Sequence, residues 1–266
     1  MRKGVGTVRP KPVRLLAVVP APPARKPAGE DVPLDSSRNG ALKRFGKNKD
    51  VIVAGKHCGS LFINHDGWLF RYKLLHNGNR QVLDFILPGQ VFGLQACLFS
   101  RSLYSVTSVT EASVSVIPFD MIDQVFEQSP KLGKSLFWSA VCESAVLGEH
   151  LIDTARRSAY ERVSHLLLEL LIRLKSVNLT RRFSFEMPLT QELIGDALGL
   201  TAVHVNRTLR SLRDDKLIEI DGKWITLVDI DAMSSLCDFE NSYLGDAQRL
   251  LRQEMALLKS ALPIGA

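Results

Sequence analysis

One stretch constrains the fold more than any other: residues 188–227, PLTQELIGDALGLTAVHVNRTLRSLRDDKLIEIDGKWITL. Thr190 is placed to cap a first helix, which Gly199 ends because glycine readily adopts the left-handed turn conformation. Thr201 is placed to cap a second helix, and two β-prone runs then flank the hairpin dipeptide Asp221-Gly222. Two short helices across a tight turn, followed by a hairpin, predict a winged helix-turn-helix.

The second predicted helix has two chemically different faces. Val205, Leu209 and Leu212 recur at the spacing of a buried face. The residues on or near the other face are Ala202, Val203, Asn206, Arg207, Arg210 and Arg213. Asn and Arg side chains can make bidentate hydrogen bonds to purine edges, so this face suits the major groove of double-stranded DNA. The alternative is a helical hairpin whose polar face is merely solvated.

The net charge of +6 is unevenly distributed over the 266 residues. Residues 1–50 hold 12 Lys/Arg against 4 Asp/Glu, whereas residues 51–266 hold 22 against 24. Because 7 of the 12 prolines precede residue 36, we expect residues 1–38 to form a disordered basic arm. The arm could add contacts to phosphates, or it could have no role.

Several protein classes are disfavoured by what the sequence does not contain. The four cysteines have no zinc-site or iron–sulfur spacing, which favours reduced thiols in a cytoplasmic protein. No run of 18 or more apolar residues predicts a membrane span, and the apolar residues 15–19 are too few for a signal peptide. We find no Gly-rich phosphate loop, metal-ligand cluster or nucleophile motif, so we expect neither an enzyme nor a bound cofactor.

The region from residue 39 to residue 128 changes to short β-prone runs separated by turn residues. These runs are residues 51–53, 61–63, 68–75, 81–87 and 103–117. The sequence His76-Asn77-Gly78-Asn79 predicts a turn between two of them. Many short strands with frequent turns predict a small antiparallel barrel or roll, similar to a jelly roll. A short helix over residues 119–126 is expected to follow.

A long helix over residues 130–156 carries two neighbouring apolar columns. Such a helix can cover its own roll with one column and meet a partner helix with the other, which predicts a homodimer. The expected dimer contacts are Phe137, Val141, Ser144, Leu147 and Leu151. The alternative is a core helix buried within a single chain. A hinge at residues 153–158 and a helix over residues 159–175 then lead into the winged helix-turn-helix.

The sequence therefore predicts an α+β fold in five parts. They are a basic arm (1–38), a β-roll sensor domain (39–128), a dimerisation helix with its hinge (129–157), a winged helix-turn-helix domain (158–231) and a helical extension (232–266). The extension could pack on the winged domain or on the dimer, or it could contact a partner.

This order of parts resembles the bacterial Crp/Fnr family of transcription regulators over about residues 40–230. The most specific segment is LTQELIGDALGLTAVHVNRTLRSLRDDKLI, supported by residues 67–75 and by PGQVFGLQACLFSRSLYSVTSVTEASV in the roll. The resemblance implies a homodimer on a near-palindromic operator, with recognition helices about 34 Å apart. It points further to the branch that controls nitrogen-fixation and low-oxygen genes. Activation would also require contact with RNA polymerase.

The resemblance implies DNA contacts from one set of residues at the start of the second helix: Thr201, Ala202, Val203, His204, Asn206, Arg207 and Arg210. Arg207 falls where family members place an arginine that contacts a base or phosphate. Val203 falls where many members carry a base-reading glutamate; valine can only pack on a thymine methyl, so the half-site should differ. Thr201, His204 and Arg210 are better suited to phosphates, although His204 could instead be packed or solvated.

The resemblance also places a degenerate effector pocket at Phe92, Gly93, Leu94, Arg101, Tyr104 and Ser105. Leu94 replaces the glutamate that binds the ribose of a cyclic nucleotide, and Tyr104 replaces the arginine that binds its phosphate. Arg101 could substitute only if its loop shifted. We therefore expect no tight binding of cyclic AMP, and a more apolar pocket that could accept another small ligand.

Other signals and another class of function stay open at this point. An iron–sulfur cluster would need closely spaced thiolates ahead of Cys58, and none exists there. Redox sensing by Cys97 or Cys142 competes with buried structural thiols. A rival to the DNA-binding regulator is a small-molecule-sensing protein that acts through protein contacts.

Overall fold

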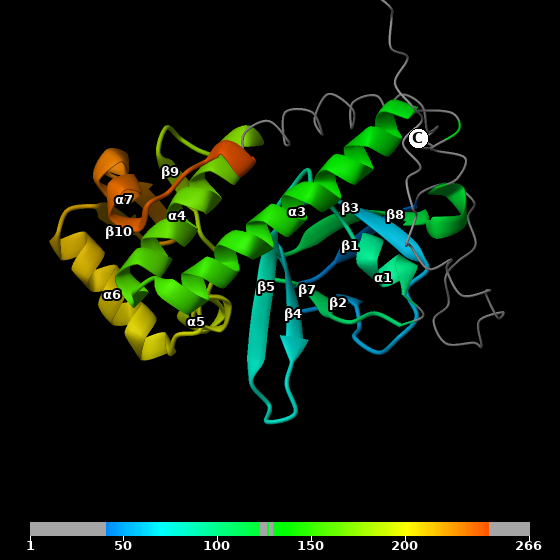
Figure 1. The fold of residues 1–266 in the computed structure, drawn as a ribbon, viewed down its shortest axis with the longest axis horizontal. Helices are drawn as coiled ribbons and strands as arrows, with labels where there is room; N and C mark the ends of the chain where they lie inside the picture. Colours follow the sequence, from blue (N-terminus) through cyan, green and yellow to red (C-terminus); the bar gives the residue numbers. More distant parts are fainter. Residues whose placement is uncertain (1–40, 100, 123–126, 128–129, 245–266) are drawn as a thin grey trace, which may run out of the picture. The chain divides into compact units, whose positions relative to one another are not determined.

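The computed structural model describes residues 41–99, 101–122, 127 and 130–244 (Figure 1). The predicted arm, residues 1–38, and most of the predicted extension lie outside these residues. In the described part of the chain, no helix is long and apolar enough to cross a membrane.

The N-terminal half forms a roll of two four-stranded antiparallel sheets, ordered β1-β8-β3-β6 and β2-β7-β4-β5. Their strands are β1 (Ala41–Phe45), β2 (Asp50–Ile52), β3 (Ser60–Asp66), β4 (Leu69–Leu74), β5 (Arg80–Ile86), β6 (Val91–Phe92), β7 (Ser105–Ser108) and β8 (Ala112–Pro118). The roll therefore contains every predicted β run, but the run 103–117 is split into β7 and β8. Strands β1 and β6 were not predicted from the sequence.

The core of the roll lies between its two sheets. It combines residues of both sheets, namely Ile52, Phe62, Leu69, Ile86, Phe92, Val106, Val114 and Val116. The predicted turn after β4 is present, since the Leu75 amide donates to the Asn79 carbonyl and Gly78 has a φ of 83°. Glycine suits that position because a positive φ is strained for most other residues.

Three helical elements follow strands of the roll. They are α1 (Leu94–Leu98), the short 3-10 helix η1 (Phe119–Met121) and α3 (Pro130–Arg156). Helix α1 was not predicted from the sequence. Of the helix predicted over residues 119–126, η1 is described, and residues 123–126 lie outside the described part. Helix α3 is 27 residues long and ends within the predicted hinge.

Helix α4 (Ala159–Ser176) begins with a capping box, in which the Ser158 side chain accepts from the Glu161 amide and the Glu161 side chain accepts from the Ser158 amide. This arrangement satisfies backbone donors that the first helical turn cannot pair. The interruption between α3 and α4 is therefore only two residues long, Arg157 and Ser158.

The winged helix-turn-helix consists of a three-stranded sheet, ordered β10-β11-β9, and the helices packed on it. Its elements are β9 (Ser184–Glu186), α5 (Gln191–Leu198), α6 (Ala202–Asp214), β10 (Ile218–Asp221), β11 (Trp224–Leu227) and α7 (Ile230–Cys237). In the hairpin Asp221 pairs with Trp224, so the loop is Gly222-Lys223 and not Asp221-Gly222. Gly222 is therefore the first residue of the loop and not the second, and glycine suits it because its φ is 57°.

Helix α7 crosses the boundary that the sequence placed after residue 231. Met233 and Cys237 are buried in the same core as α4 and β11, and Asp229 caps the helix by accepting from the Ala232 amide. The sequence left open whether the extension packs on the winged domain, on the dimer or on a partner. Its first part, in α7, packs on the winged domain.

Candidate nucleic-acid interface and sensor interior

Helix α6 is held by local signals at its start and by buried apolar residues at its back. Thr201 caps it, with Oγ1 accepting from the His204 amide at 3.2 Å, and Gly199 turns the chain before it with a φ of 65°. Val205 and Leu212 are completely buried. Because the back is fixed, the direction of the front side chains is fixed as well.

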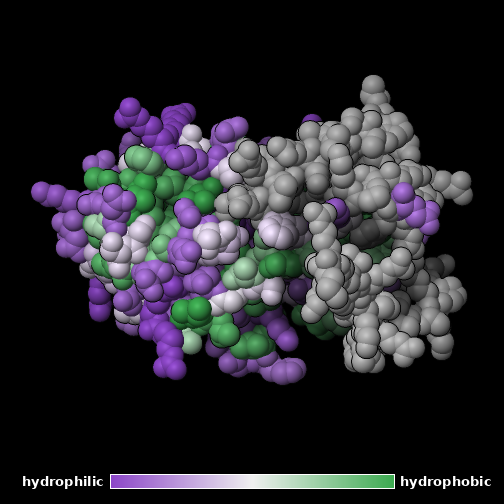
Figure 2. Space-filling view, turned by 45° about the horizontal axis from the view of Figure 1, so that its top comes forward, coloured by the Kyte–Doolittle hydropathy of each residue, from purple (hydrophilic) through white to green (hydrophobic). Residues whose placement is uncertain are grey.

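The front of α6 is exposed and basic. Val203 is 68% exposed although it is apolar, and Asn206, Arg207 and Arg210 are exposed beside it. A shallow hollow of about 380 Å³ is lined by Gln191, Ala202, Val203, Asn206, Arg207 and Arg210. The structure thus brings five of the seven predicted DNA-binding residues to one hollow, with Thr201 and His204 exposed at the start of the helix. Figure 2 shows many hydrophilic residues around the winged helix-turn-helix.

Gln191, the first residue of α5, also lines this hollow and was missed by the sequence analysis. Its place follows from the tight turn at Gly199, which brings the start of α5 beside α6. A Cβ on Gly195 would lie 2.5 Å from the Leu200 carbonyl oxygen, so the close approach of the two helices requires glycine there.

Helix α3 exposes an apolar stripe. Phe137 is 69% exposed, Leu151 is 68% exposed, and Val141 and Ser144 are exposed between them. These four predicted dimer residues are spaced as the seam of a coiled coil. Leu147, the fifth, is half-buried and lies beside the stripe. Trp138 and Ile152 are exposed as well and were not predicted.

The predicted effector residues do not form one pocket. Phe92 and Tyr104 are buried in the core between the sheets, whereas Leu94 packs against a separate cluster on β3. Gly93 has a φ of 93°, and a Cβ there would lie 2.8 Å from the Phe62 ring. Ser105 accepts from the Ala54 amide at 2.9 Å. Arg101 is exposed and donates to the Gly55 carbonyl at 3.3 Å, so it does not reach the interior.

The interior around Tyr104 is charged, which corrects the expectation of an apolar pocket. The buried guanidinium of Arg71 lies 5.1 Å from the centre of the Tyr104 ring. It forms ion pairs with Glu143 of α3 and, at 3.7 Å, with Asp84 of β5. Desolvation raises the pKa of Tyr104 to about 12, so its hydroxyl stays protonated. Gln95 of α1 donates to the same Glu143 carboxylate at 3.2 Å.

A second buried ion cluster joins β5 of the roll to α4. Arg173 Nη1 lies 3.0 Å from Asp84 and 2.6 Å from Glu169, and its side chain is 1% exposed. Burial alone would raise the pKa of Glu169, but the attraction of His150 and Arg173 lowers it to about 2. Asp84 therefore belongs to both clusters, since it also faces Arg71.

His150 of α3 completes this second cluster. Its two ring nitrogens lie 2.9 Å from Glu169 Oε2 and 3.0 Å from the Leu83 carbonyl oxygen. Both partners are acceptors, so both ring nitrogens must carry a proton. Burial alone would lower the pKa of His150, but the attraction of Glu169 raises it to about 9. No charged residue of these clusters was predicted from the sequence, although Glu169 and Arg173 interrupt an apolar helix face one turn apart.

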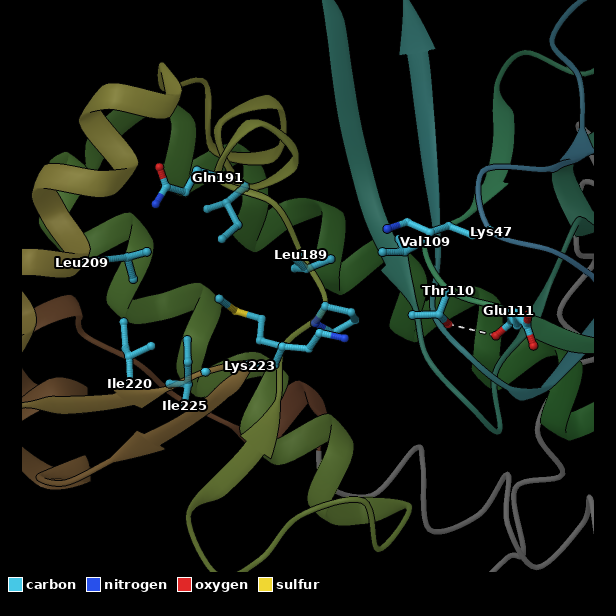
Figure 3. A pocket seen from close by; sticks show the side chains of 14 residues that line it. Lys47, Val109, Thr110, Glu111, Leu189, Gln191, Leu209, Ile220, Lys223 and Ile225 are labelled. Carbon is cyan, nitrogen blue, oxygen red and sulfur yellow. Dashed lines mark hydrogen bonds between the residues drawn. The ribbon is translucent and has the colours of Figure 1, made fainter.

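A separate groove of about 570 Å³ is lined by both the roll and the winged helix-turn-helix (Figure 3). Figure 3 shows Leu209, Ile220 and Ile225 on the winged side and Val109 and Thr110 on the roll. The described residues that line it include none of the predicted effector residues. Among the residues that the structure describes, no group of three or more His, Cys, Asp or Glu could hold a metal ion.

Two family models match the chain and together cover more than half of it. Residues 42–129 match the cyclic nucleotide-binding domain, and residues 161–236 match the Crp-like helix-turn-helix domain. The nitrogen fixation regulation protein FixK of Bradyrhizobium diazoefficiens is 31% identical over 193 residues, which are 71% of this chain and 79% of that protein. The anaerobic regulatory protein of Pasteurella multocida is 26% identical over 194 residues, 73% of this chain and 71% of that protein.

Solved structures show the same fold. FixK2 from Bradyrhizobium japonicum has a TM-score of 0.67 at 24% identity, covering 74% of this chain and 96% of that one. CooA from Carboxydothermus hydrogenoformans, solved as a mutant, has a TM-score of 0.61 at 13% identity, covering 74% of this chain and 88% of that one.

Proposed function

The chain belongs to the Crp/Fnr family of transcription regulators, and from that membership we propose that it binds a near-palindromic operator as a homodimer without cyclic AMP. Members of the family regulate transcription through a DNA-binding helix-turn-helix and act as dimers. The observation that carries the proposal for this chain is the exposed front of α6, where Val203, Asn206 and Arg207 line one hollow. A regulator of this kind works in the cytoplasm, where the DNA lies.

The front of α6 supports a division of roles in DNA binding. Asn206 and Arg207 can hydrogen-bond base edges, and exposed Val203 can pack on a thymine methyl. Thr201, His204 and Arg210 are placed for phosphates, which set register without reading sequence. We therefore expect a half-site that contains a thymine where relatives with a glutamate select cytosine.

The exposed stripe of α3 supports the homodimer. Phe137, Val141 and Leu151 would be hydrophobic surface in contact with water if the chain were alone. A second copy of α3 would cover them with the same three residues, because a two-fold axis makes such an interface self-complementary. The two copies of α6 would then reach major grooves about 34 Å apart.

The charged interior of the roll supports independence from cyclic AMP. A nucleotide phosphate near Arg71 would compete with the Glu143 and Asp84 carboxylates, and Leu94 offers no acceptor to a ribose hydroxyl. A different effector, or a redox signal, could still act on the roll.

Selection of random duplex DNA by the purified full chain, with and without cyclic AMP, tests this proposal. We expect a two-fold-symmetric site that is unchanged by the nucleotide. Arg207→Ala should lose about 1–3 kcal/mol of binding to that site. Val203→Glu should move the selected base from thymine toward cytosine. Arg44→Ala, which removes an exposed arginine of β1 in the roll, is the matched control.

Leu151→Glu tests the dimer in the same assay. Because Leu151 is exposed in a single chain, the variant should fold but select only a single half-site, and sedimentation should show a monomer. A dimeric Leu151→Glu would overturn the α3 interface. Site selection only with cyclic AMP would overturn the independence from the nucleotide. No selection under either condition, with weak binding of all duplexes, would favour action through protein contacts.

A further inference from the structure

Two cysteines that are distant in sequence lie against one carbonyl group at the edge of the roll. Cys97 Sγ is 2.8 Å from the carbonyl oxygen of Ser60, and Cys58 Sγ is 3.5 Å from the same oxygen. The two thiols are also hydrogen-bonded to each other. Cys58 precedes β3, and Cys97 belongs to the short helix α1, so the pair connects a strand of the roll to a surface helix.

The pKa of Cys58 is shifted in the opposite direction from those of Cys142 and Cys237. The hydrogen bond from Cys97 lowers the pKa of Cys58 to about 7, so a large fraction of Cys58 is thiolate at neutral pH. Desolvation raises the pKa of Cys142, and it raises the pKa of Cys237 to about 12. The thiolate is the reactive form of cysteine, so Cys58 is the nucleophile and Cys97 the neighbour that can resolve its oxidised product.

We propose that Cys58 and Cys97 are a dithiol that hydrogen peroxide oxidises to an intramolecular disulfide. The Cys58 thiolate attacks one peroxide oxygen, the O–O bond breaks, and sulfenic acid and hydroxide form. Cys97 then attacks the sulfenic sulfur, the S–O bond breaks, and water leaves with the Cys97 proton. Two electrons pass from the two sulfurs to the peroxide, and a dithiol reductant returns them with two protons.

The pair lies close to exposed residues, although Cys58 itself is buried. Cys58 is 9% exposed and follows exposed His57, and Cys97 is half-buried beside exposed Leu98. A disulfide requires the sulfurs to approach to about 2.05 Å. Helix α1 has only five residues, and it is the element that would move to bring Cys97 toward Cys58.

A movement of α1 would change its contact with α3, the proposed dimerisation helix. Gln95, two residues before Cys97, donates to Glu143 of α3, and Glu143 pairs with Arg71 in the interior of the roll. Closing the disulfide would therefore pull on the hydrogen bond that joins α1 to α3. This consequence rests on the proposed function, because it acts on DNA binding through the dimer, whereas the dithiol chemistry does not depend on it.

The experiment oxidises the reduced full chain with hydrogen peroxide, blocks free thiols with an alkylating reagent and identifies the linked peptides by mass spectrometry. We expect one reducible link, between the peptides of Cys58 and Cys97. Cys142→Ser and Cys237→Ser are the matched controls and should keep this link. Cys97→Ser should lack it and should accumulate sulfenic or sulfinic acid at Cys58, while its melting temperature shows that it folds.

A wild-type chain with four alkylated thiols after peroxide treatment would overturn the proposal, and so would a link that involves Cys142 or Cys237.

The selected operator then serves as the second readout. Oxidation should change its affinity about fivefold or more in the wild type and not in Cys97→Ser. A disulfide with unchanged operator affinity would overturn the coupling through Gln95 and Glu143. Failure of all DNA binding would instead count against the proposed function, since the mass measurement stands without DNA.

Discussion

Helix α6, the proposed recognition helix, and the interior of the roll, the proposed sensor, are built in opposite ways. In α6 the contacts that set its start are local, such as Thr201 to the His204 amide three residues later. In the sensor interior the contacts join residues far apart in sequence, such as Arg71 to Glu143, 72 positions away, and Arg173 to Asp84, 89 positions away. The proposed DNA-reading surface is thus a local motif, whereas the interior is a junction of the roll, α3 and α4.

The difference extends to where the charges lie. Arg207 and Arg210 of α6 are exposed and ready to meet phosphates or bases. Arg71 and Arg173 are buried and satisfied by carboxylates of other elements. Replacing an exposed arginine should therefore change binding and not folding, and replacing a buried one should change folding first.

The largest expected effect is that of Arg173→Met. The variant leaves Asp84 and Glu169 buried without their cation, and breaking a buried pair in this way typically costs about 3–5 kcal/mol. The free energy of unfolding, measured by urea denaturation, should fall by that amount. Binding to DNA should weaken only in proportion to the unfolded fraction.

Arg80→Met is the matched control for Arg173→Met. Arg80 pairs with Asp196 of α5 at 2.6 Å and likewise joins the roll to the helix-turn-helix, but both side chains are about a third exposed. Solvent screens such a pair, so the expected loss is about 0–1 kcal/mol. Equal losses in the two variants would contradict the distinction between buried and exposed charges.

A smaller effect is expected from the titration of His150. The pKa of His150 rises from 6.5 in the unfolded chain to about 9 in the folded one, so the folded state holds its proton more tightly. The resulting stability is fully present below pH 6.5 and is lost as the pH rises through about 9. The free energy of unfolding should fall in that window by at most about 3 kcal/mol.

His150→Gln isolates this titration. The amide can still donate to Glu169 but carries no proton that is lost in this range, so the pH dependence between 6.5 and 9 should flatten. His204→Gln, on the exposed front of α6, should keep the wild-type dependence. A His150→Gln curve parallel to the wild type would show that another group is responsible.

The same contrast explains how much the sequence could predict. Caps, turns and apolar periodicity are local, so α4, α5, α6 and the wing were predicted closely, with the hairpin loop displaced by one residue. The strands β1 and β6 were missed because short runs such as Val91–Phe92 carry little periodicity. The ion clusters were missed because no spacing rule links Asp84 to Arg173. The sequence showed that Tyr104 stands where related proteins have a pocket arginine. It did not show that the fold places Arg71 beside Tyr104.

The smallest expected effect concerns Thr201, because its hydroxyl both caps α6 and is proposed to contact a DNA phosphate. Its Oγ1 accepts from the His204 amide, and its hydrogen remains able to donate to a phosphate. Thr201→Ala removes both functions and should cost about 1 kcal/mol of stability. Thr201→Asp keeps an acceptor at the cap and places a negative charge at the favourable end of the helix, so stability should stay near that of the wild type.

The two Thr201 variants should rank in opposite orders for stability and for DNA affinity. The aspartate would face phosphates, so Thr201→Asp should bind more weakly than Thr201→Ala, and its deficit should shrink as salt screens the repulsion. Ser158→Asp adds the same charge at the cap of α4, a helix without predicted DNA contacts, and should bind as the wild type does. Wild-type affinity in Thr201→Asp, measured by fluorescence anisotropy over a range of salt concentrations, would mean that Thr201 only caps α6. In that case the front of α6 would meet DNA through the residues from Val203 onward, because a charge at the cap residue Thr201 would lie too far from the phosphates to affect binding.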